Sequence, residues 1–377
     1  MEIYLDNSAT TRQFDEVTGA MMEMMSKDYG NPSSLHHIGL VAETAVKKAR
    51  KQVAAAFGTD ESRIFFTSGG TESDNTAIFG AAKTKKRQGK RIITTKIEHP
   101  AVLESYKRLE DEGYEAVYID VLENGIVDME KLEDAITDDT ILISVMYVNN
   151  ETGAVQPVEK IAKLKRNALF HVDAVQSFGK MSLPLKGVDT IAVSGHKIHG
   201  PKGMGALYVA DGVNIKPFIV GGGQERNFRS GTENVPGIVG MGLASEMVTS
   251  DLGARYTKME ELRTRLLKDL EGIDNVRINT YEGSCPSVLN VSFLGTRGEV
   301  ILHTLERNGV YVSTGSACSS HHGGGSHVLK AMGLSDKEID GAIRFSLSAE
   351  NTPEEMDEAA RITREAVENF RRLGSLR

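Results

Sequence analysis

The sequence of 377 residues lacks the features that mark secreted, membrane-bound or nucleic-acid-binding proteins. It has only two cysteines, Cys285 and Cys318, which is too few for a disulfide framework. No apolar run approaches the roughly 18 residues that cross a bilayer, and the N-terminus has no signal-peptide pattern. The formal net charge of −8 disfavours nucleic acid as a direct partner. We therefore expect a cytoplasmic protein that binds neither membranes nor nucleic acid.

Apolar runs that alternate with helical patterns predict an α/β fold with a large domain. The strand-like runs lie at residues 64–66, 91–95, 116–119, 141–147, 169–172, 190–193 and 206–209. Helical patterns fill most of the intervals between them, as expected for a mostly parallel sheet of seven strands between helices. In such sheets ligands bind at the carboxyl ends of the strands, so the polar residues found there are the candidates for a site.

The C-terminal third has a different pattern, which predicts a smaller α+β domain. A long helix over 238–270 is expected to lead into strands at 287–293, 310–313 and 342–347 and helices at 299–308, 326–332 and 353–373. Thr352, Pro353 and Glu355 have the spacing of a helix N-terminus. We expect an N-terminal segment, 1–15, that packs with this domain, a large domain, 16–255, and the small domain, 256–377, which carries Cys318.

Residues 67–75, Thr-Ser-Gly-Gly-Thr-Glu-Ser-Asp-Asn, form a glycine turn between an expected strand and an expected helix. Exposed backbone N–H groups and the positive end of the helix dipole make such a turn an anion site. The pattern is neither the G-x-G-x-x-G of dinucleotide sites nor a P-loop, so a single phosphate group fits it better than those ligands. A capped helix start without a ligand is the structural alternative.

Asp173 ends another expected strand, and Lys197 lies in a glycine-rich loop, 194–205, between two more. A buried carboxylate needs a cationic partner, such as a protonated pyridine nitrogen, although Asp173 would alternatively cap the next helix. A lysine in such a loop can capture an aldehyde as a Schiff base, whereas most loop lysines are solvated. Together with the phosphate site, the pair matches the needs of pyridoxal phosphate. Lys197 would also be the base for the substrate Cα proton.

Other residues at the strand ends suit the same kind of site. His99 follows a strand and could stack on a cofactor ring or be structural, and Asn149 and Asn150 offer amides at the end of another strand. Arg344 lies inside an apolar strand, where its charge requires an anionic partner. The carboxylate of an amino-acid substrate is the simplest such partner.

Cys318 lies in a glycine-rich segment of small residues, which favours a nucleophilic thiol on a mobile loop. His321 and His322 could help to favour the thiolate. A metal site built from these three residues is the alternative, but adjacent histidines do not easily face one ion and no second ligand cluster is evident. We therefore expect no metal. Cys285 has no comparable surroundings and is interpreted as structural.

In combination, these motifs resemble the cysteine desulfurases of the NifS and IscS type. That family belongs to the fold-type I, class V aminotransferase-like group of pyridoxal phosphate enzymes. The resemblance covers nearly the whole chain, and the motifs that carry it lie at residues 29–34, 67–75, 98–100, 148–151, 171–177, 194–197, 229–232 and 315–319. It implies a homodimer that converts L-cysteine to L-alanine and leaves a persulfide on Cys318.

The resemblance also implies a role for each residue of the site. Lys197 would hold the cofactor and move protons, His99 would stack on the ring, and Asn150 would contact the cofactor. Asp173 would pair with the pyridine nitrogen and Gln176 would bond the phenolic oxygen. The phosphate group would be held by Gly70, Thr71, Ser194, His196 and, from the other subunit, Thr232. Asn150 and Arg344 would bind the substrate carboxylate.

The sequence departs from the family pattern in three places. Residues 319–326, Ser-Ser-His-His-Gly-Gly-Gly-Ser, lack the proline common in relatives, and residues 344–348 end in serine rather than glycine. The chain also stops at Arg377, without the C-terminal segment that docks the iron–sulfur scaffold in IscS proteins. Cysteine desulfurases deliver sulfur to protein acceptors for iron–sulfur cluster assembly or for thiolation, and this last departure favours a tRNA- or thiamine-thiolation enzyme as the acceptor.

Two other classes of function stay open at this point. A selenocysteine lyase or class V aminotransferase would use the same fold and cofactor, but an aminotransferase needs no mobile cysteine. A non-catalytic sulfur-carrier scaffold would not need the intact set of Lys197, Asp173, His99 and Cys318.

Overall fold

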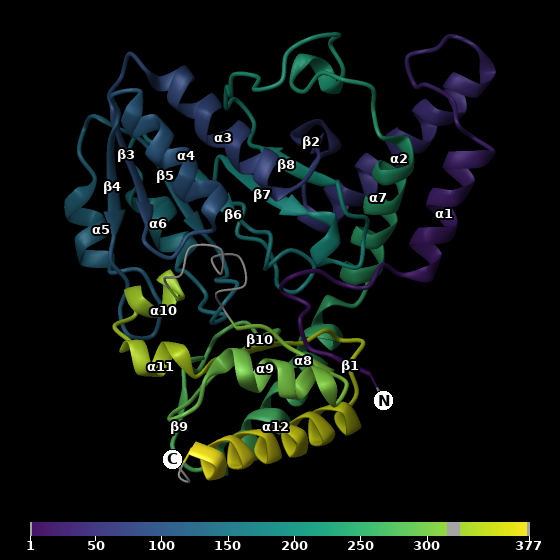
Figure 1. Ribbon diagram of the computed structural model, residues 1–377. Helices are drawn as coiled ribbons and strands as arrows, with labels where there is room; N and C mark the ends of the chain where they lie inside the picture. The colour runs from purple at the N-terminus through teal and green to yellow at the C-terminus, as the bar shows by residue number, and fades with distance from the viewer. Residues whose placement is uncertain (1, 315–324, 375–377) are drawn as a thin grey trace.

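A seven-stranded sheet forms the centre of the larger part of the molecule (Figure 1). The computed structural model describes residues 2–314 and 325–374. The strand order is β2-β8-β7-β6-β5-β3-β4, and every pairing is parallel except the two made by β8. The mostly parallel sheet predicted from the sequence is confirmed. Its strands are β2 (Ile64–Thr67), β3 (Arg91–Thr95), β4 (Glu115–Ile119), β5 (Thr140–Met146), β6 (Leu169–Asp173), β7 (Thr190–Ser194) and β8 (Gly205–Val209).

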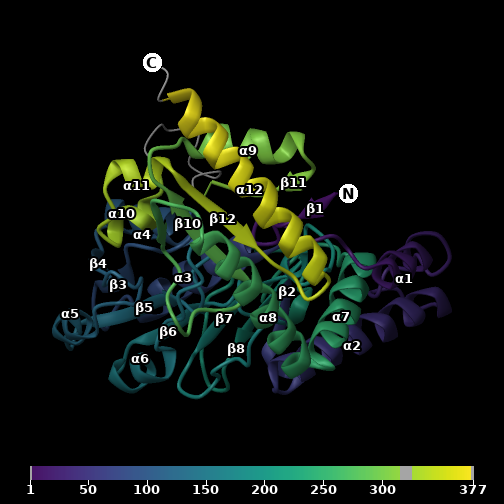
Figure 2. The ribbon, with the colours of Figure 1, turned by 90° about the horizontal axis from the view of Figure 1, so that it is seen from below.

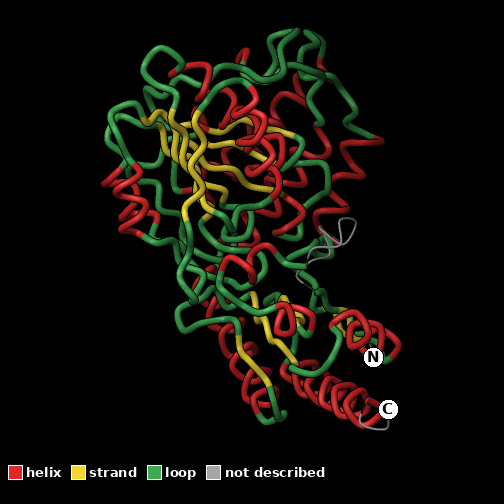
Figure 3. Tube along the Cα trace, turned by 60° about the vertical axis from the view of Figure 1, so that its left-hand side comes forward, coloured by secondary structure: helices red, strands yellow, loops and turns green. Residues whose placement is uncertain are grey.

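Helices cover both faces of this sheet (Figure 3). Alternate residues of a strand point to opposite faces, so in β7 Ile191 and Val193 join one apolar core and Ala192 joins the other. The helices α3 (Gly70–Lys85) and α4 (Pro100–Asp111) cover one face. The other face is covered by α1 (Asp15–Ser26), α2 (His37–Phe57), α5 (Met129–Ala135), α6 (Val158–Leu164) and α7 (Val235–Thr249).

A smaller antiparallel sheet of order β12-β10-β9 lies in the second part of the molecule, beneath α12 in the view of Figure 2. Together with its helices it confirms the predicted α+β unit. Its elements are α8 (Leu252–Glu271), β9 (Val276–Ile278), β10 (Val288–Phe293), α9 (Gly298–Arg307), β11 (Val310–Tyr311), α10 (His327–Ala331), α11 (Asp336–Asp340), β12 (Ala342–Ser346) and α12 (Pro353–Gly374). Three short 3₁₀ turns complete the described chain: η1 (Glu61–Arg63), η2 (Gly195–Lys197) and η3 (Glu225–Asn227).

The chain's N-terminal strand lies in this smaller part. The strand β1 (Ile3–Tyr4) pairs in parallel with β11, and Ile3 and Leu5 are buried in the apolar core of the smaller part. From there the chain crosses to the large sheet, where the Thr11 N–H donates to the His196 carbonyl (2.9 Å). The domain limits 1–15, 16–255 and 256–377 stay a prediction.

The start of α12 confirms the predicted cap, whereas the predicted helix over 238–270 was wrong. At α12 the Thr352 N–H donates to Glu355 Oε2 (3.0 Å) and the Glu355 N–H donates to Thr352 Oγ1 (3.3 Å). The stretch 238–270 contains two helices, α7 and α8, because Asp251 leaves the helical conformation and caps α8 by accepting from the Ala254 N–H (3.4 Å). Apolar periodicity on both sides of a break does not reveal the break.

Within the part of the chain that the structure describes, no helix is long and apolar enough to cross a membrane.

Candidate active site

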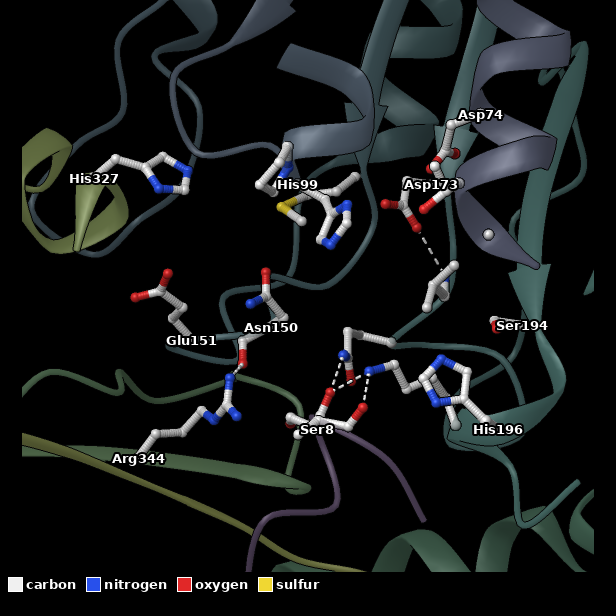
Figure 4. A pocket seen from close by; sticks show the side chains of 18 residues that line it. Ser8, Asp74, His99, Asn150, Glu151, Asp173, Ser194, His196, His327 and Arg344 are labelled. Atoms are coloured by element: carbon white, nitrogen blue, oxygen red, sulfur yellow. Dashed lines mark hydrogen bonds between the residues drawn. The ribbon is translucent and has the colours of Figure 1, made fainter. Parts of the chain in front are cut away.

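A cavity of about 330 Å³ opens at the carboxyl ends of the parallel strands, where the large sheet meets the smaller part (Figure 4). Its walls come from the N-terminal segment, the loops after β2, β3, β5, β6 and β7, the start of α10, and β12. It brings together most of the predicted site residues: Gly70, Thr71, His99, Asn150, Asp173, Gln176, Ser194, His196, Lys197 and Arg344. The rule that ligands lie at the carboxyl ends of strands therefore located the cavity correctly.

The anion-binding end of the cavity is the glycine turn between β2 and α3. Gly69 has a φ of 156° and a ψ of −177°, a conformation open to glycine alone. A Cβ on Gly205 of β8 would lie 2.6 Å from the Gly69 Cα, so the strand must have a glycine beside this turn. The turn leaves the first N–H groups of α3 beside Thr71 and Ser194 at the cavity wall.

The His196 ring forms the side of this anion-binding end. Its Nδ1 lies 3.2 Å from Thr10 Oγ1. Burial, together with the charge of the nearby Lys197, lowers the pKa of His196 to about 4. The ring is therefore neutral at physiological pH and offers a hydrogen bond rather than a charge.

Asp173 lines the cavity from the last residue of β6. Its side chain is buried, and Oδ1 accepts a hydrogen bond from the Val175 N–H (2.9 Å). Burial raises the pKa of Asp173, against the opposing effects of His99 and Lys197. A cationic group placed against this carboxylate would lower its pKa and stabilise its charge.

A second buried carboxyl group, Asp74 of α3, lies beside Asp173. Its Oδ1 is 3.0 Å from His171 Nε2, and His171 Nδ1 is 2.9 Å from Thr190 Oγ1. Burial raises the pKa of Asp74, and the charge of Asp173 raises it further. Burial also lowers the pKa of His171 to about 3, so a neutral imidazole connects Asp74 to Thr190 beneath the site.

Lys197 ends the 3₁₀ turn that follows β7. Its Nζ donates to the backbone carbonyls of Ser8 and Ala9, the latter at 2.7 Å. The N-terminal segment therefore holds the amine at the cavity wall (Figure 4). Across the cavity, His99 caps α4, where its Nδ1 accepts from the Ala101 N–H (3.1 Å). Burial lowers the pKa of His99, and because Nδ1 accepts a hydrogen bond, the neutral ring carries its proton on Nε2.

Arg344 enters the cavity from β12, which belongs to the smaller part. Its Nη1 donates to the Asn150 carbonyl (3.1 Å) and its Nη2 donates to Asp6 Oδ1 (2.7 Å). The anionic partner that the sequence required is therefore provided at least in part by Asp6, which lies 338 residues away. The remaining donor, Nε, is buried without a hydrogen-bond partner among the described residues.

The comparisons with known proteins establish the family. The sequence matches the family Aminotransferase class-V over residues 3–358. It is 44% identical over 379 residues to a protein named Cysteine desulfurase IscS from Methanosarcina thermophila, over 99% of this chain and 94% of that protein. The chain belongs to the cysteine desulfurase family within aminotransferase class V.

Solved structures extend this likeness to three dimensions. A structure described as NIFS-LIKE PROTEIN aligns with a TM-score of 0.92 at 42% identity, over 98% of this chain and 100% of that chain. Another, described as SspA in complex with cysteine, aligns with a TM-score of 0.83 at 33% identity, over 93% of this chain and 100% of that chain. The desulfurase fold therefore includes both the large sheet and the smaller part.

Membership of aminotransferase class V implies pyridoxal phosphate, and the cavity of this desulfurase fits such a group. Ser8 Oγ and Arg344 Nε are both at the cavity and both buried without a hydrogen-bond partner in the described ranges 2–314 and 325–374. The glycine turn at α3 suits a phosphate, and the buried Asp173 suits a cationic ring nitrogen. An anionic, hydrogen-bonding ligand would satisfy these unpaired groups.

The remaining predicted site residues are Thr232 and Cys318. Thr232 is exposed and is not part of this cavity, and its role at a neighbouring subunit stays a prediction. Cys318 lies outside the described residues, as do His321 and His322. Among the described residues, no group of three or more His, Cys, Asp or Glu side chains could hold a metal. Cys285 is fully buried, with its Sγ 3.3 Å from Ser287 Oγ.

Several site residues were missed because they become neighbours only in three dimensions. Ser326 caps α10 and donates to the buried carboxylate of Glu151, while His327 Nε2 lies 3.0 Å from the Glu98 carbonyl. Burial raises the pKa of Glu151 to about 7 and that of Glu98 to about 8. Glu98 and Glu151 each adjoin a residue that the sequence did point to, which is the signal that could have identified them.

Proposed function

We propose that this desulfurase binds pyridoxal phosphate in the cavity and converts L-cysteine to L-alanine, with the sulfur left as a persulfide on Cys318. The observation that carries the proposal is the convergence of Lys197, Asp173 and His99, from three separate strand ends, on one cavity with a glycine anion turn. When bound, the cofactor supplies an electron sink that makes the bonds at the substrate Cα and Cβ labile.

Each residue of the chain would contribute a defined part of the chemistry. Lys197 anchors the cofactor and, once released by the substrate, moves a proton at the substrate Cα. Asp173 keeps the ring nitrogen protonated because its buried charge needs that partner. His99 Nε2–H lies on the wall opposite Lys197 and would position the ring. The glycine turn with Thr71, Ser194 and His196 would hold the phosphate group.

The experiment that tests the proposal is turnover by the purified protein supplied with pyridoxal phosphate and L-cysteine. We expect alanine and persulfide-derived sulfide in equal amounts under reducing conditions. Selenocysteine in place of cysteine tests the lyase alternative, and transfer of the amino group to a 2-oxo acid tests the aminotransferase alternative. A protein that binds the cofactor and yields no alanine from cysteine would contradict the proposal.

Substrate binding is assigned to Arg344 and Asn150. We expect Arg344→Gln to lower kcat/KM for L-cysteine by roughly 10- to 100-fold, mainly through KM, because a charge-assisted pair contributes about 1.5–3 kcal/mol. Sulfide production at varied cysteine concentration measures the effect. Arg361→Gln, which changes an arginine paired with Glu358 and Glu365 on α12, is the matched control. Equal KM values for Arg344→Gln and the wild type would remove Arg344 from the substrate site.

We also propose that the enzyme is a homodimer. Large apolar side chains are exposed on α1, α2 and the loop between them: Met22, Met25, Tyr29, Leu35, Ile38 and Leu40. A second copy of the chain would cover this patch, and Thr232 would reach the phosphate site of its partner. Wild-type protein is expected to sediment as a dimer, and the double variant Leu35→Asp/Leu40→Asp is expected to shift toward monomer.

The control for the dimer is Leu122→Asp, which changes an exposed leucine away from the patch. It is expected to leave the dimer intact. An active wild-type monomer in sedimentation would contradict the dimer and the role of Thr232. The sulfur acceptor, whether an iron–sulfur scaffold or a thiolation enzyme, and a cytoplasmic site of action stay predictions from the sequence.

A further inference from the structure

A buried lysine, Lys180, lies behind the cavity and has no part in the chemistry described above. It is only 6% exposed, and its Nζ donates to Gln176 Oε1 (3.2 Å). No carboxylate pairs with it in the described part of the chain. Burying an ammonium group without a counter-ion is costly, and burial together with the charge of Arg344 lowers the pKa of Lys180. Because this burial is costly, we expect the contacts of Lys180 to show a role that compensates it.

The contact with Lys180 determines how the Gln176 side chain is oriented. An amide has an oxygen end that accepts and a nitrogen end that donates, and the two ends have nearly the same shape. A lysine ammonium can only donate, so it requires the oxygen end of Gln176. The nitrogen end then donates to the Ser8 carbonyl (3.0 Å).

The Ser8 carbonyl connects this pair to the catalytic lysine. It accepts from Gln176 Nε2 and also from Lys197 Nζ, as the dashed lines at Ser8 in Figure 4 show. Gln176 lines the cavity, and its Nε2 has a second N–H beyond the one given to Ser8. With Lys180 in place, the group that Gln176 offers to a ligand is a donor.

We propose that Lys180 is a positioning residue that orients the Gln176 amide so that its N–H, and not its carbonyl, meets the ring oxygen of the bound cofactor. The inference rests on the proposed function, because it assumes that pyridoxal phosphate binds in this cavity. A hydrogen-bond donor at the ring oxygen would stabilise the anionic form of that oxygen. The oxygen would then bind less strongly the proton that it shares with the nitrogen of Lys197, which would lower the pH at which this proton is lost. Without Lys180 the amide can rotate and present its oxygen, which repels an anionic ring oxygen.

The test is the pH dependence of the visible absorption of the cofactor-bound protein. Lys180→Met removes the donor and keeps much of the shape. It is expected to move the midpoint of the titration upward by on the order of one pH unit, since the ring oxygen loses a charge-assisted neighbour. Lys180→Arg keeps a donor-only cation and is expected to titrate near the wild type. Lys186→Met, at an exposed lysine in the following loop, is the matched control and should not shift.

Lys180 also interacts with other charged and titratable groups, so a direct effect of its charge must be distinguished from its effect on Gln176. Lys180 faces Arg344 and Cys285, and its charge also acts on His196 and His199. The variant Gln176→Ala isolates the amide from these groups. It should reproduce the shift of Lys180→Met, and the double variant should show no additional shift. A Lys180→Met shift that persists in full on the Gln176→Ala background would show a direct charge effect and would overturn the orientation role.

A second variant keeps the test usable if Lys180→Met does not fold. Gln176→Glu retains an oxygen for Lys180 and removes the N–H, so it is expected to show the same upward shift and about tenfold weaker binding of pyridoxal phosphate to the apoprotein. A wild-type titration in Gln176→Glu or Lys180→Met would overturn the inference. Borohydride reduction followed by mass spectrometry shows whether Lys197 of the wild-type protein is bound to the cofactor. A wild-type protein without this adduct would contradict the proposed function, whereas an adduct with unshifted variants would contradict only the role of Lys180.

Discussion

Lys197→Ala is expected to give a colourless, inactive protein that is otherwise folded. The substitution removes the only amine that the N-terminal segment holds at the cavity wall through Ser8 and Ala9 within the described residues. Under the proposed function it also removes the covalent anchor of the cofactor and the base at the substrate Cα. Loss of the base alone costs about 10²- to 10⁴-fold in rate, and loss of the anchor adds to this. Visible absorption, borohydride reduction and sulfide release from L-cysteine measure the three consequences.

Lys186→Ala is the control, because that lysine is exposed and does not line the cavity. It is expected to keep both colour and activity. An unchanged melting temperature of the cofactor-free proteins would show that the Lys197 variant is folded. A Lys197→Ala protein that still forms a borohydride-stable cofactor adduct would transfer the anchoring role to another lysine.

The parts of the candidate site whose common position the sequence predicted are those made by short segments of chain. The glycine turn at 67–75 and Asp173 at the end of β6 were evident because a strand, a turn and a helix start follow one another within a few residues. The parallel sheet places the carboxyl ends of its strands along one edge. Residues that follow different strands therefore become neighbours in the cavity.

The parts that the sequence could not predict depend on approaches between distant segments. Nothing in the apolar run around Arg344 indicates that Asp6, from the other end of the chain, is its partner. The sequence around Lys180 is that of an ordinary exposed turn, and only the fold shows that this lysine is buried behind Gln176. The break between α7 and α8 also escaped prediction, because one capping aspartate, Asp251, has more influence there than the apolar spacing around it.

The described residues on both sides of 315–324 are hydrogen-bonded to residues of the site. Before this range, Ser313 exchanges backbone hydrogen bonds with Arg344 (2.7 and 3.1 Å), and after it, Ser326 donates to the Glu151 carboxylate. Arg344 and Glu151 both line the cavity, so the described flanks of residues 315–324 contact residues of the cavity wall. This attachment is what a nucleophile needs if it acts on a substrate held by Arg344.

Cys318→Ala is therefore expected to abolish persulfide and sulfide formation from L-cysteine while it leaves the absorption of the bound cofactor unchanged. The loss should be roughly 10³-fold or more, as expected when a covalent nucleophile is removed from an otherwise intact site. Mass spectrometry of the persulfide and release of sulfide under reducing conditions measure it. Cys285→Ala is the matched control: this thiol is fully buried beside Ser287, so its loss should affect stability and not sulfur transfer. Undiminished sulfide release by Cys318→Ala would mean that another acceptor takes the sulfur directly, and would assign the reaction to a lyase that needs no persulfide cysteine.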